Sequence, residues 1–142
     1  MSVLFSDRLY HPGEKIEAAI QLITGVRLDL ASAHAELLCR PRRGTPLPDV
    51  RVAEAGQGGE MVHSQAVFSG RRLIASGAEE VFSFALRIGR QPPPAWIGPN
   101  PRWRLRVRFA LYNGTDVSSV TNVRVESDWE RFGMSSRDEA DE

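Results

Sequence analysis

Apolar and polar side chains alternate along most of this chain, and no other feature limits its fold as strongly. The pattern is clearest in residues 80–88, where apolar side chains occupy every second position. A period of two places alternate side chains on opposite faces of a β-strand, whereas an amphipathic helix needs a period near 3.6. Residues 102–112 repeat the pattern. We therefore predict two strands that bury Phe82, Phe84, Leu86, Trp103, Leu105, Val107 and Phe109.

The same period predicts further strands at residues 15–23, 26–30, 33–40, 60–69 and 117–126, after a short apolar opening at residues 3–5. Turn residues separate them, as in Thr24-Gly25, Ser76-Gly77 and the hairpin signal Asn113-Gly114. No window has the pattern of a helix, and five prolines within residues 90–101 exclude both strand and helix there. We predict an all-β, antiparallel, immunoglobulin-like β-sandwich of about seven to eight strands.

The length of the chain, 142 residues, fits a single domain. We predict that residues 1–128 form the sandwich and that the polar, acidic residues 129–142 are a disordered tail. Residues 41–59 contain three prolines and four glycines. This composition predicts a long mobile connection, with a short edge segment at residues 50–52.

The charge balance narrows the class of partner. Eighteen basic residues are offset by 18 acidic ones, so the formal net charge is zero. Nucleic acids and anionic membranes usually select an excess of basic residues, so neither is the expected partner. No stretch approaches the roughly 18 consecutive apolar residues that suggest a membrane-spanning helix. The first ten residues lack the basic start and the apolar run of a signal peptide, and the expected location is the cytoplasm.

Motifs of catalysis and metal binding are missing from the sequence. Cys39 is the single cysteine, so an internal disulfide is excluded, and its apolar neighbours predict a buried, inert thiol. The histidines at positions 11, 34 and 63 lack the spacing of a zinc site. The sequence contains neither a glycine-rich phosphate loop before a helix nor a Gly-x-Ser-x-Gly elbow. We expect no catalytic residue, no cofactor and no metal.

One strand carries a row of arginines, within the sequence RWRLRVRF at residues 102–109. Its alternation places four guanidinium groups on the face opposite the apolar side chains: Arg102, Arg104, Arg106 and Arg108. Two interpretations stay open. The arginines pair across strands with acidic residues such as Glu17, Glu80 or Glu126, which also protects the sheet from aggregation. Alternatively, they form a binding face for a phosphate, a carboxylate or an acidic partner segment.

Three segments, taken in order, resemble the N-terminal domain of arrestins. Residues 9–22, LYHPGEKIEAAIQL, resemble the family's Tyr-x-Pro-Gly-Glu signature through Tyr10, Pro12, Gly13 and Glu14, although alanine replaces the glycine that follows. Residues 73–96 resemble a strand of the family that precedes a proline-rich stretch; the matches are Ala75, Gly77, Phe82, Phe84, Leu86 and the prolines 92–94. Residues 101–111 stand where arrestin-like chains have an Ile-x-Tyr-x-Val-x-Val strand.

The resemblance implies an arrestin-like fold and a non-catalytic scaffold or adaptor that binds other proteins. It also implies that Pro12-Gly13 is a corner of the chain rather than a site, because proline presets φ and glycine tolerates a positive φ. Arrestin-like proteins normally have two such domains, and single or paired domains occur in bacterial sporulation-control proteins. Since this chain has room for one domain, a homodimer is the simplest expected assembly.

A second class of function stays open from the residues themselves. A β-sandwich can bind a small ligand or a carbohydrate on an aromatic platform, and Trp96 and Trp103 with nearby arginines are the candidates here. A deep pocket around Trp96 would favour this alternative. An enzyme is a third class, and nothing in the sequence favours it.

Overall fold

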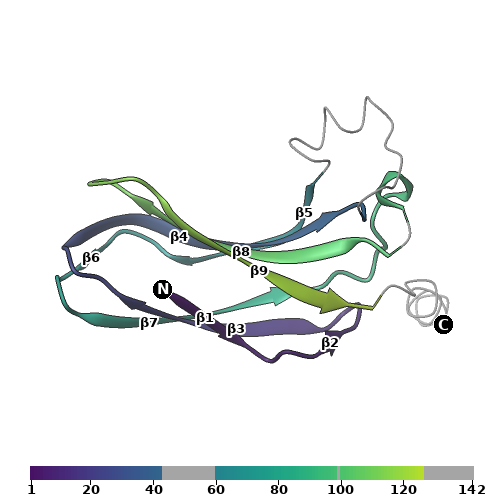
Figure 1. The fold of residues 1–142 in the computed structure, drawn as a ribbon, viewed down its shortest axis with the longest axis horizontal. Coiled ribbons are helices and arrows are strands. Elements are labelled where there is room, and N and C mark those ends of the chain that lie inside the picture. Colours follow the sequence, from purple (N-terminus) through teal and green to yellow (C-terminus); the bar gives the residue numbers. More distant parts are fainter. Residues whose placement is uncertain (43–59, 99, 127–142) are drawn as a thin grey trace.

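A computed structural model describes residues 1–42, 60–98 and 100–126 (Figure 1). Most of these residues belong to strands, which form two layers facing each other. The elements in chain order are β1 (Ser2–Phe5), β2 (Leu9–Tyr10), β3 (Lys15–Ile23), β4 (Leu28–Arg40), β5 (Met61–Ser69), β6 (Arg72–Ile74), β7 (Glu79–Arg87), the 3-10 helix η2 (Ala95–Ile97), β8 (Arg102–Leu111) and β9 (Val117–Val125). The sequence prediction of a β-sandwich is confirmed.

The smaller layer is a three-stranded sheet with the order β1-β3-β7, and the larger is a six-stranded sheet with the order β2-β9-β8-β4-β5 in which β6 also pairs with β4. All pairs are antiparallel except the short parallel pair of β2 with β9. Two details differ from the sequence prediction. The expected strands at 26–30 and 33–40 are one long strand, β4, which changes register between Leu30 and Ser32. The short strands β2 and β6 were not predicted, because too few residues carry an alternating pattern.

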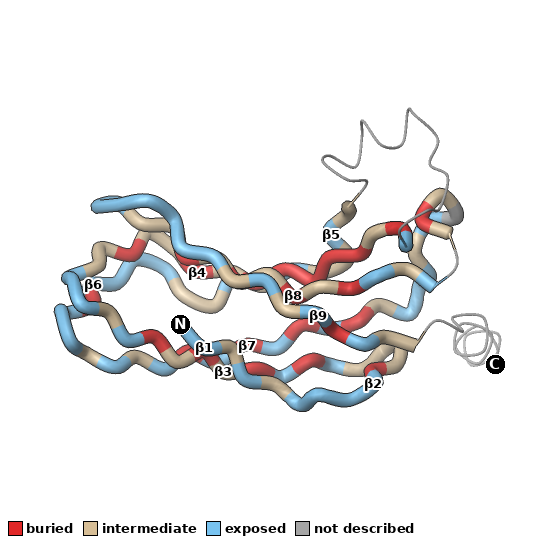
Figure 2. Tube along the Cα trace, in the orientation of Figure 1, coloured by how far each residue is buried: buried red, intermediate tan, exposed pale blue. Residues whose placement is uncertain are grey.

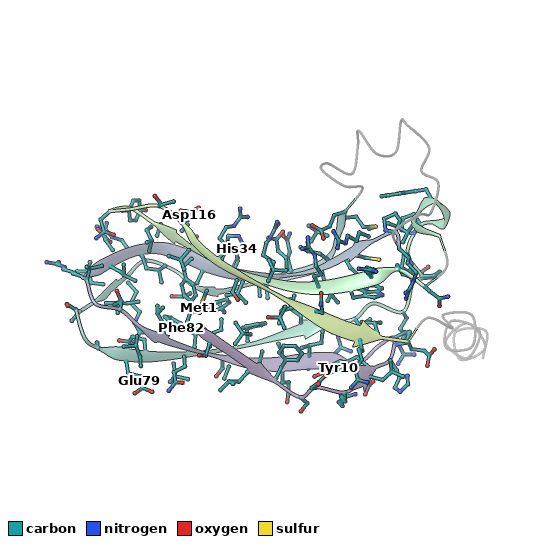
Figure 3. The ribbon with its side chains drawn as sticks, in the orientation of Figure 1. Met1, Tyr10, His34, Glu79, Phe82 and Asp116 are labelled. Carbon is teal, nitrogen blue, oxygen red and sulfur yellow. The ribbon has the colours of Figure 1, made fainter. Side chains whose placement is uncertain are left out.

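The core lies between the two sheets (Figure 2). All seven residues that the alternation assigns to the core are buried: Phe82, Phe84, Leu86, Trp103, Leu105, Val107 and Phe109. The inward residues of β3 and β4 complete it, and Phe68 of β5 bridges the layers, with its ring centroid 5.1 Å from that of Phe84 and 5.8 Å from that of Phe109. Figure 3 shows Phe82 pointing between the sheets and His34 on the outer side of the larger one.

The Tyr-x-Pro-Gly-Glu segment is a corner held by its own hydrogen bonds. The buried Tyr10 donates its hydroxyl hydrogen to the carbonyl of Ser6 at 2.7 Å. The carboxylate of Glu14 accepts the backbone N–H of His11 at 2.6 Å. Burial alone would raise the pKa of Glu14, but the hydrogen bonds from His11 and Arg8 lower it. These contacts turn the chain from β2 into β3.

Gly13 provides the backbone geometry of this corner. Its φ is +89°, a conformation that glycine adopts without a steric penalty. Its N–H donates to the carbonyl of Ile88 at 2.7 Å, which joins the corner to the end of β7. A Cβ at this position would lie 3.1 Å from Nε of Arg90. This positive φ agrees with the expected corner at Pro12-Gly13.

The β8–β9 hairpin forms where Asn113-Gly114 predicts it, but its connection is longer than a two-residue turn. Neither residue has a positive φ, which a type I′ turn requires. Instead, the side chain of Asn113 accepts the N–H of Asp29 at 2.9 Å and donates to the carbonyl of Arg27 at 3.0 Å. The asparagine therefore ties the hairpin to the start of β4.

A single 3-10 turn, η2, interrupts the proline-rich connection, where neither helix nor strand was expected, and it buries Ile97 in the core. Three predictions concern residues outside the described ranges. They are the edge segment at 50–52, most of the connection at 41–59 and the tail at 129–142.

Candidate functional site

The arginine row lies along β8 on the outer face of the six-stranded sheet. The side chains that alternate with the arginines are buried in the core: Trp103, Leu105, Val107 and Phe109. The strand geometry therefore directs the guanidinium groups outward. The strand lies between β4 and β9 in the sheet. Each arginine therefore faces a side chain of β4, and these neighbours determine its electrostatic environment.

Arg106 pairs directly across the sheet with Glu36 of β4. The two residues are register partners, and Nε and Nη2 of Arg106 lie 3.1 and 2.8 Å from the same carboxylate oxygen, Oε1. The residue Glu36 is only 6% exposed. Nη2 of Arg108 lies 3.6 Å from that same oxygen, and Nε of Arg108 donates to Nε2 of His34 at 3.0 Å. One buried carboxylate, that of Glu36, thus compensates the positive charges of two arginines.

Arg104 reaches over the neighbouring strand to Glu60. Its Nε and Nη2 lie 2.9 and 2.5 Å from Oε2 of Glu60, which comes just before β5. Since β4 separates β8 from β5, this ion pair spans β4 at the level of Leu38, the register partner of Arg104. Leu38 is 2% exposed although it does not belong to the core between the sheets. The aliphatic part of an arginine can cover such a residue while the charged end stays paired.

The partners of the arginine row are therefore not the expected ones. Glu17 and Glu80 lie in β3 and β7 of the other sheet, and Glu80 pairs with Arg72 at 2.6 Å. Oε2 of Glu126 lies 3.9 Å from Nδ1 of His11. Cross-strand pairing occurs as one interpretation predicted, but Glu36 and Glu60 provide it. We call the pairs of Arg104, Arg106 and Arg108 with Glu60, Glu36 and His34 the charge ladder.

Arg102, the first arginine of the row, has a different environment. Its register partner on β4 is Arg40, another cation. Arg102 also lines a hollow of about 420 Å³ with Arg42 and Arg124, to which Asn100 and Asn122 contribute amide groups. Nε of Arg42 donates to the carbonyl of Asn100 at 3.1 Å, and Arg124 lies 3.4 Å from the exposed Asp7. We call this group of Arg40, Arg42, Arg102 and Arg124 the arginine end.

Within the described residues, Arg40, Arg42 and Arg102 form no ion pair with a carboxylate. Arg124 has one, with Asp7, whose side chain is almost fully solvated. Such an exposed pair is worth little. The arginine end is therefore a concentration of positive charge on a chain whose formal net charge is zero.

The two candidate tryptophans, Trp96 and Trp103, do not form a common platform. Trp103 is 3% exposed, and the edge of its ring meets His63, with the centroids 4.9 Å apart. Trp96, in η2, is partly buried against the core. It lines neither the hollow at the arginine end nor a second hollow, of about 710 Å³, on the outer face of the three-stranded sheet.

Comparison with solved structures places this geometry in a known fold. The chain is similar to Spo0M, a sporulation control protein from Bacillus subtilis, with a TM-score of 0.69 over 88% of this chain. The fold is arrestin-like. The two sequences are 16% identical, so the likeness is one of fold, and the chain spans about half of Spo0M, 48% of its length. The sequence matches no protein-family model and no curated protein.

In this arrestin-like sandwich, Cys39 is in an unreactive setting. Burial, with a further contribution from Glu60, raises the pKa of the Cys39 thiol to about 12, so the thiolate is scarce at neutral pH. Among the described residues, no three side chains of His, Cys, Asp or Glu gather as a metal site would require. In the same ranges, no helix is long and apolar enough to cross a membrane.

Sequence reasoning found Arg102 but missed the residues that surround it. Arg42, Asn100, Asn122 and Arg124 come from three separate segments, and no local pattern brings them together. The ladder partner Glu36 did carry a signal, because it alternates with Ala35 and Leu37 and so faces outward from its strand. No sequence signal indicated that Glu36 pairs with Arg106, which lies 70 positions away in the chain.

His63 gives this sandwich a pH dependence with a defined sign. Its Nε2 accepts the N–H of Gly89 at 3.0 Å, and burial lowers its pKa from the ordinary 6.5. The unfolded chain therefore binds more protons than the folded one as pH falls below about 6.5, so we expect stability to fall in that range. Denaturant melts at pH 7.5 and 5 measure the effect. The decrease should be smaller in His63→Gln than in the wild-type chain; equal decreases in the two proteins would contradict it.

Proposed function

We propose that this chain is a non-catalytic protein-interaction module, an adaptor or scaffold, which binds an acidic segment of a partner protein at the arginine end. The observation that carries the proposal is the difference between the two parts of the arginine row. Arg104, Arg106 and Arg108 have partners in the charge ladder, whereas Arg102 faces Arg40 and has no carboxylate among the described residues. The arrestin-like likeness to Spo0M supports an interaction or regulatory module.

Like charges that face each other across two strands are destabilising. Arg40 and Arg102 are in this position, with Arg42 and Arg124 close by around the hollow. Carboxylates of a bound segment would relieve the repulsion. A guanidinium group also binds a carboxylate through two parallel hydrogen bonds, which gives the interaction a preferred geometry.

The hollow suits a peptide segment better than a large rigid ligand. Its volume is about 420 Å³, and residues of β2, β8 and β9 line it. The amides of Asn100 and Asn122 offer both donors and acceptors to a peptide backbone. The buried position of Trp103 removes one of the two aromatic platforms that carbohydrate binding would use. We therefore do not propose that alternative.

The binding test uses a fluorescent peptide of eight glutamates as the probe and anisotropy as the measurement. We expect the double variant Arg42→Gln/Arg102→Gln to bind the probe at least about tenfold more weakly, with a shallower dependence on salt. Arg108→Gln is the control within the row, because it removes one arginine that already has partners in the charge ladder. It should retain the wild-type affinity.

Two results would overturn the proposal. One is equal affinity of the double variant and the wild-type chain. The other is a loss of binding free energy in Arg108→Gln that is half or more of the loss in the double variant, since Arg108→Gln removes half as many charges and such a loss would show a response to total charge rather than to the arginine end. A lysine octamer tests the sign of the interaction and should not bind.

A further inference from the structure

β7 is the exposed edge of the three-stranded sheet. Within the described residues it pairs with β3 alone, over nine residues and without a change of register. Its central sequence, VFSFAL at residues 81–86, has no charge and no proline. Edge strands of soluble proteins are usually short, bulged, charged or covered, because an open ladder invites another strand. A long and regular edge with an uncharged centre therefore needs an explanation.

The other edges of the molecule show the usual protection. β1 has four residues and β2 has two. β5 is as long as β7, but its pairing with β4 changes register twice, at Ala33/His34 and at Leu37/Leu38. Such irregularities disturb the ladder and bend a strand away from a potential partner. β7 has none of these features.

The hydrogen bonds of the corner show which residues of β7 face its open side. The N–H of Ile88 donates to the carbonyl of Glu14 at 2.8 Å, so Ile88 faces the chain leading into β3. Backbone direction alternates along an antiparallel strand, and the register from Lys15–Arg87 to Ile23–Glu79 is unbroken. The odd-numbered residues of β7, from Glu79 to Arg87, therefore direct their N–H and C=O groups away from β3. Their side chains are exposed.

We propose that β7 pairs antiparallel with β7 of a second copy of this chain, with the two-fold axis at Ser83. In this register Val81 lies opposite Ala85 of the second copy, and Glu79 lies opposite Arg87 of the second copy. The facing residues are those whose backbone groups point outward, so each pair exchanges two hydrogen bonds. The two three-stranded sheets become one continuous sheet, and the interface is self-complementary, as a two-fold axis requires.

Charge complementarity selects this register. Glu79 accepts a hydrogen bond from the amide of Gln21 at 2.5 Å, and Arg87 donates one to the carbonyl of Gly13 at 3.0 Å. Neither has an ion pair within the described residues. Figure 3 shows Glu79 on the outer side of its sheet. Moving the axis by one residue, to Phe82 or Phe84, still pairs outward-facing residues but places Glu79 opposite Ala85 or Gly89, and moving it by two separates the charges further. Only the axis at Ser83 therefore places Glu79 directly opposite Arg87.

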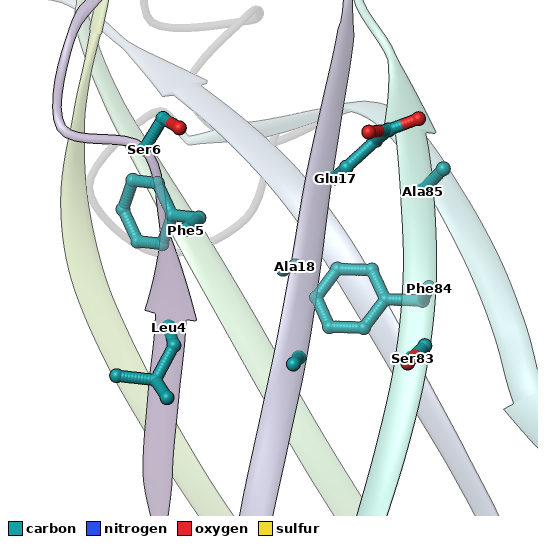
Figure 4. A pocket seen from close by; sticks show the side chains of 9 residues that line it. Leu4, Phe5, Ser6, Glu17, Ala18, Ser83, Phe84 and Ala85 are labelled. Atoms are coloured by element: carbon teal, nitrogen blue, oxygen red, sulfur yellow. The ribbon is translucent and has the colours of Figure 1, made fainter.

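The outer face beside this edge is compatible with a close neighbour. Ser83 and Ala85 present small side chains beside β3, where Glu17 lies, and Leu4 lies beyond β3 on β1; all four line the shallow hollow of about 710 Å³ (Figure 4). This surface belongs to the three-stranded sheet, whereas the arginine end belongs to the six-stranded sheet. Self-association through β7 and binding of an acidic segment can therefore fail or succeed independently.

Sedimentation velocity at about 10–100 µM protein tests the pairing, and we expect a dimer. Ser83→Pro removes an N–H that points away from β3, and proline is tolerated in an edge strand where its missing donor faces outward. This variant should therefore be monomeric while keeping the circular dichroism spectrum of the fold. A wild-type chain that stays monomeric throughout this range would overturn the proposal.

A charge exchange tests the partner and the register. Glu79→Arg and Arg87→Glu should each raise the dissociation constant of the dimer about tenfold, because each places like charges opposite one another twice. The double variant restores both pairs and should return to within about threefold of wild type. Glu17→Arg is the control: it adds the same charge on the same outer face but on β3, away from the edge, and should not change association. Failure of the double variant to recover would contradict this register, and a dimer unaffected by Ser83→Pro would exclude β7.

Discussion

Replacing Phe84 with alanine should lower the free energy of unfolding by about 3–5 kcal/mol, the range for a large aromatic side chain removed from a packed core. Phe84 is 8% exposed and stacks on Phe68 of the opposite sheet, with the ring planes 21° apart. Phe68 also contacts the rings of Phe82 and Phe109. The substitution therefore leaves a cavity at the point where the two sheets are joined by aromatic rings, and strand backbones cannot close it easily.

Urea denaturation at low micromolar concentration measures this loss without a contribution from association. Val67→Ala is the matched control, because Val67 lies in a strand of the same length and is 75% exposed. Its effect should stay within about 0.5 kcal/mol. A loss below about 1 kcal/mol for Phe84→Ala would show that the two sheets do not depend on this aromatic contact, since a packed site cannot lose a phenyl ring so cheaply.

Glu36→Gln should destabilise the fold by about 1–3 kcal/mol, the second largest effect that we expect. The substitution keeps the shape of the side chain but removes the charge that compensates both Arg106 and Arg108. These arginines are about one-third exposed or more, so water screens part of their attraction to Glu36. The loss of stability should therefore be smaller than for a fully buried ion pair.

The same denaturation experiment measures this effect, and Glu17→Gln provides the control. Glu17 is exposed on the outer face of the other sheet, where its neutralisation should change stability by about 0.5 kcal/mol or less. The difference between the two variants should shrink in 1 M salt, because salt screens the exposed side of the charge ladder. Equal stability of Glu36→Gln and the wild-type chain would mean that the ladder contributes nothing to folding.

The local sequence determined which face of each strand is buried. A period of two assigns every second residue of β7 and β8 to the core, and all seven assigned residues are buried. The corner at Gly13 was predictable for a related reason, since Pro12 presets its own φ for a turn and Gly13 tolerates the positive φ that follows. Both features depend on residues that are neighbours in the chain.

The tertiary structure alone decided which strands are neighbours, and with them the candidate sites. Arg106 meets Glu36, and Arg104 meets Glu60, because β4 lies between β8 and β5. Arg42 and Arg124 meet Arg102 because their segments end at the same side of the sandwich. Alternation specifies a face but not a partner, since any strand with an apolar face can pair with any other. The order of the strands follows from burying their apolar faces together in one core. This order places Glu60, Glu36 and His34 beside Arg104, Arg106 and Arg108, whereas it places Arg40 beside Arg102.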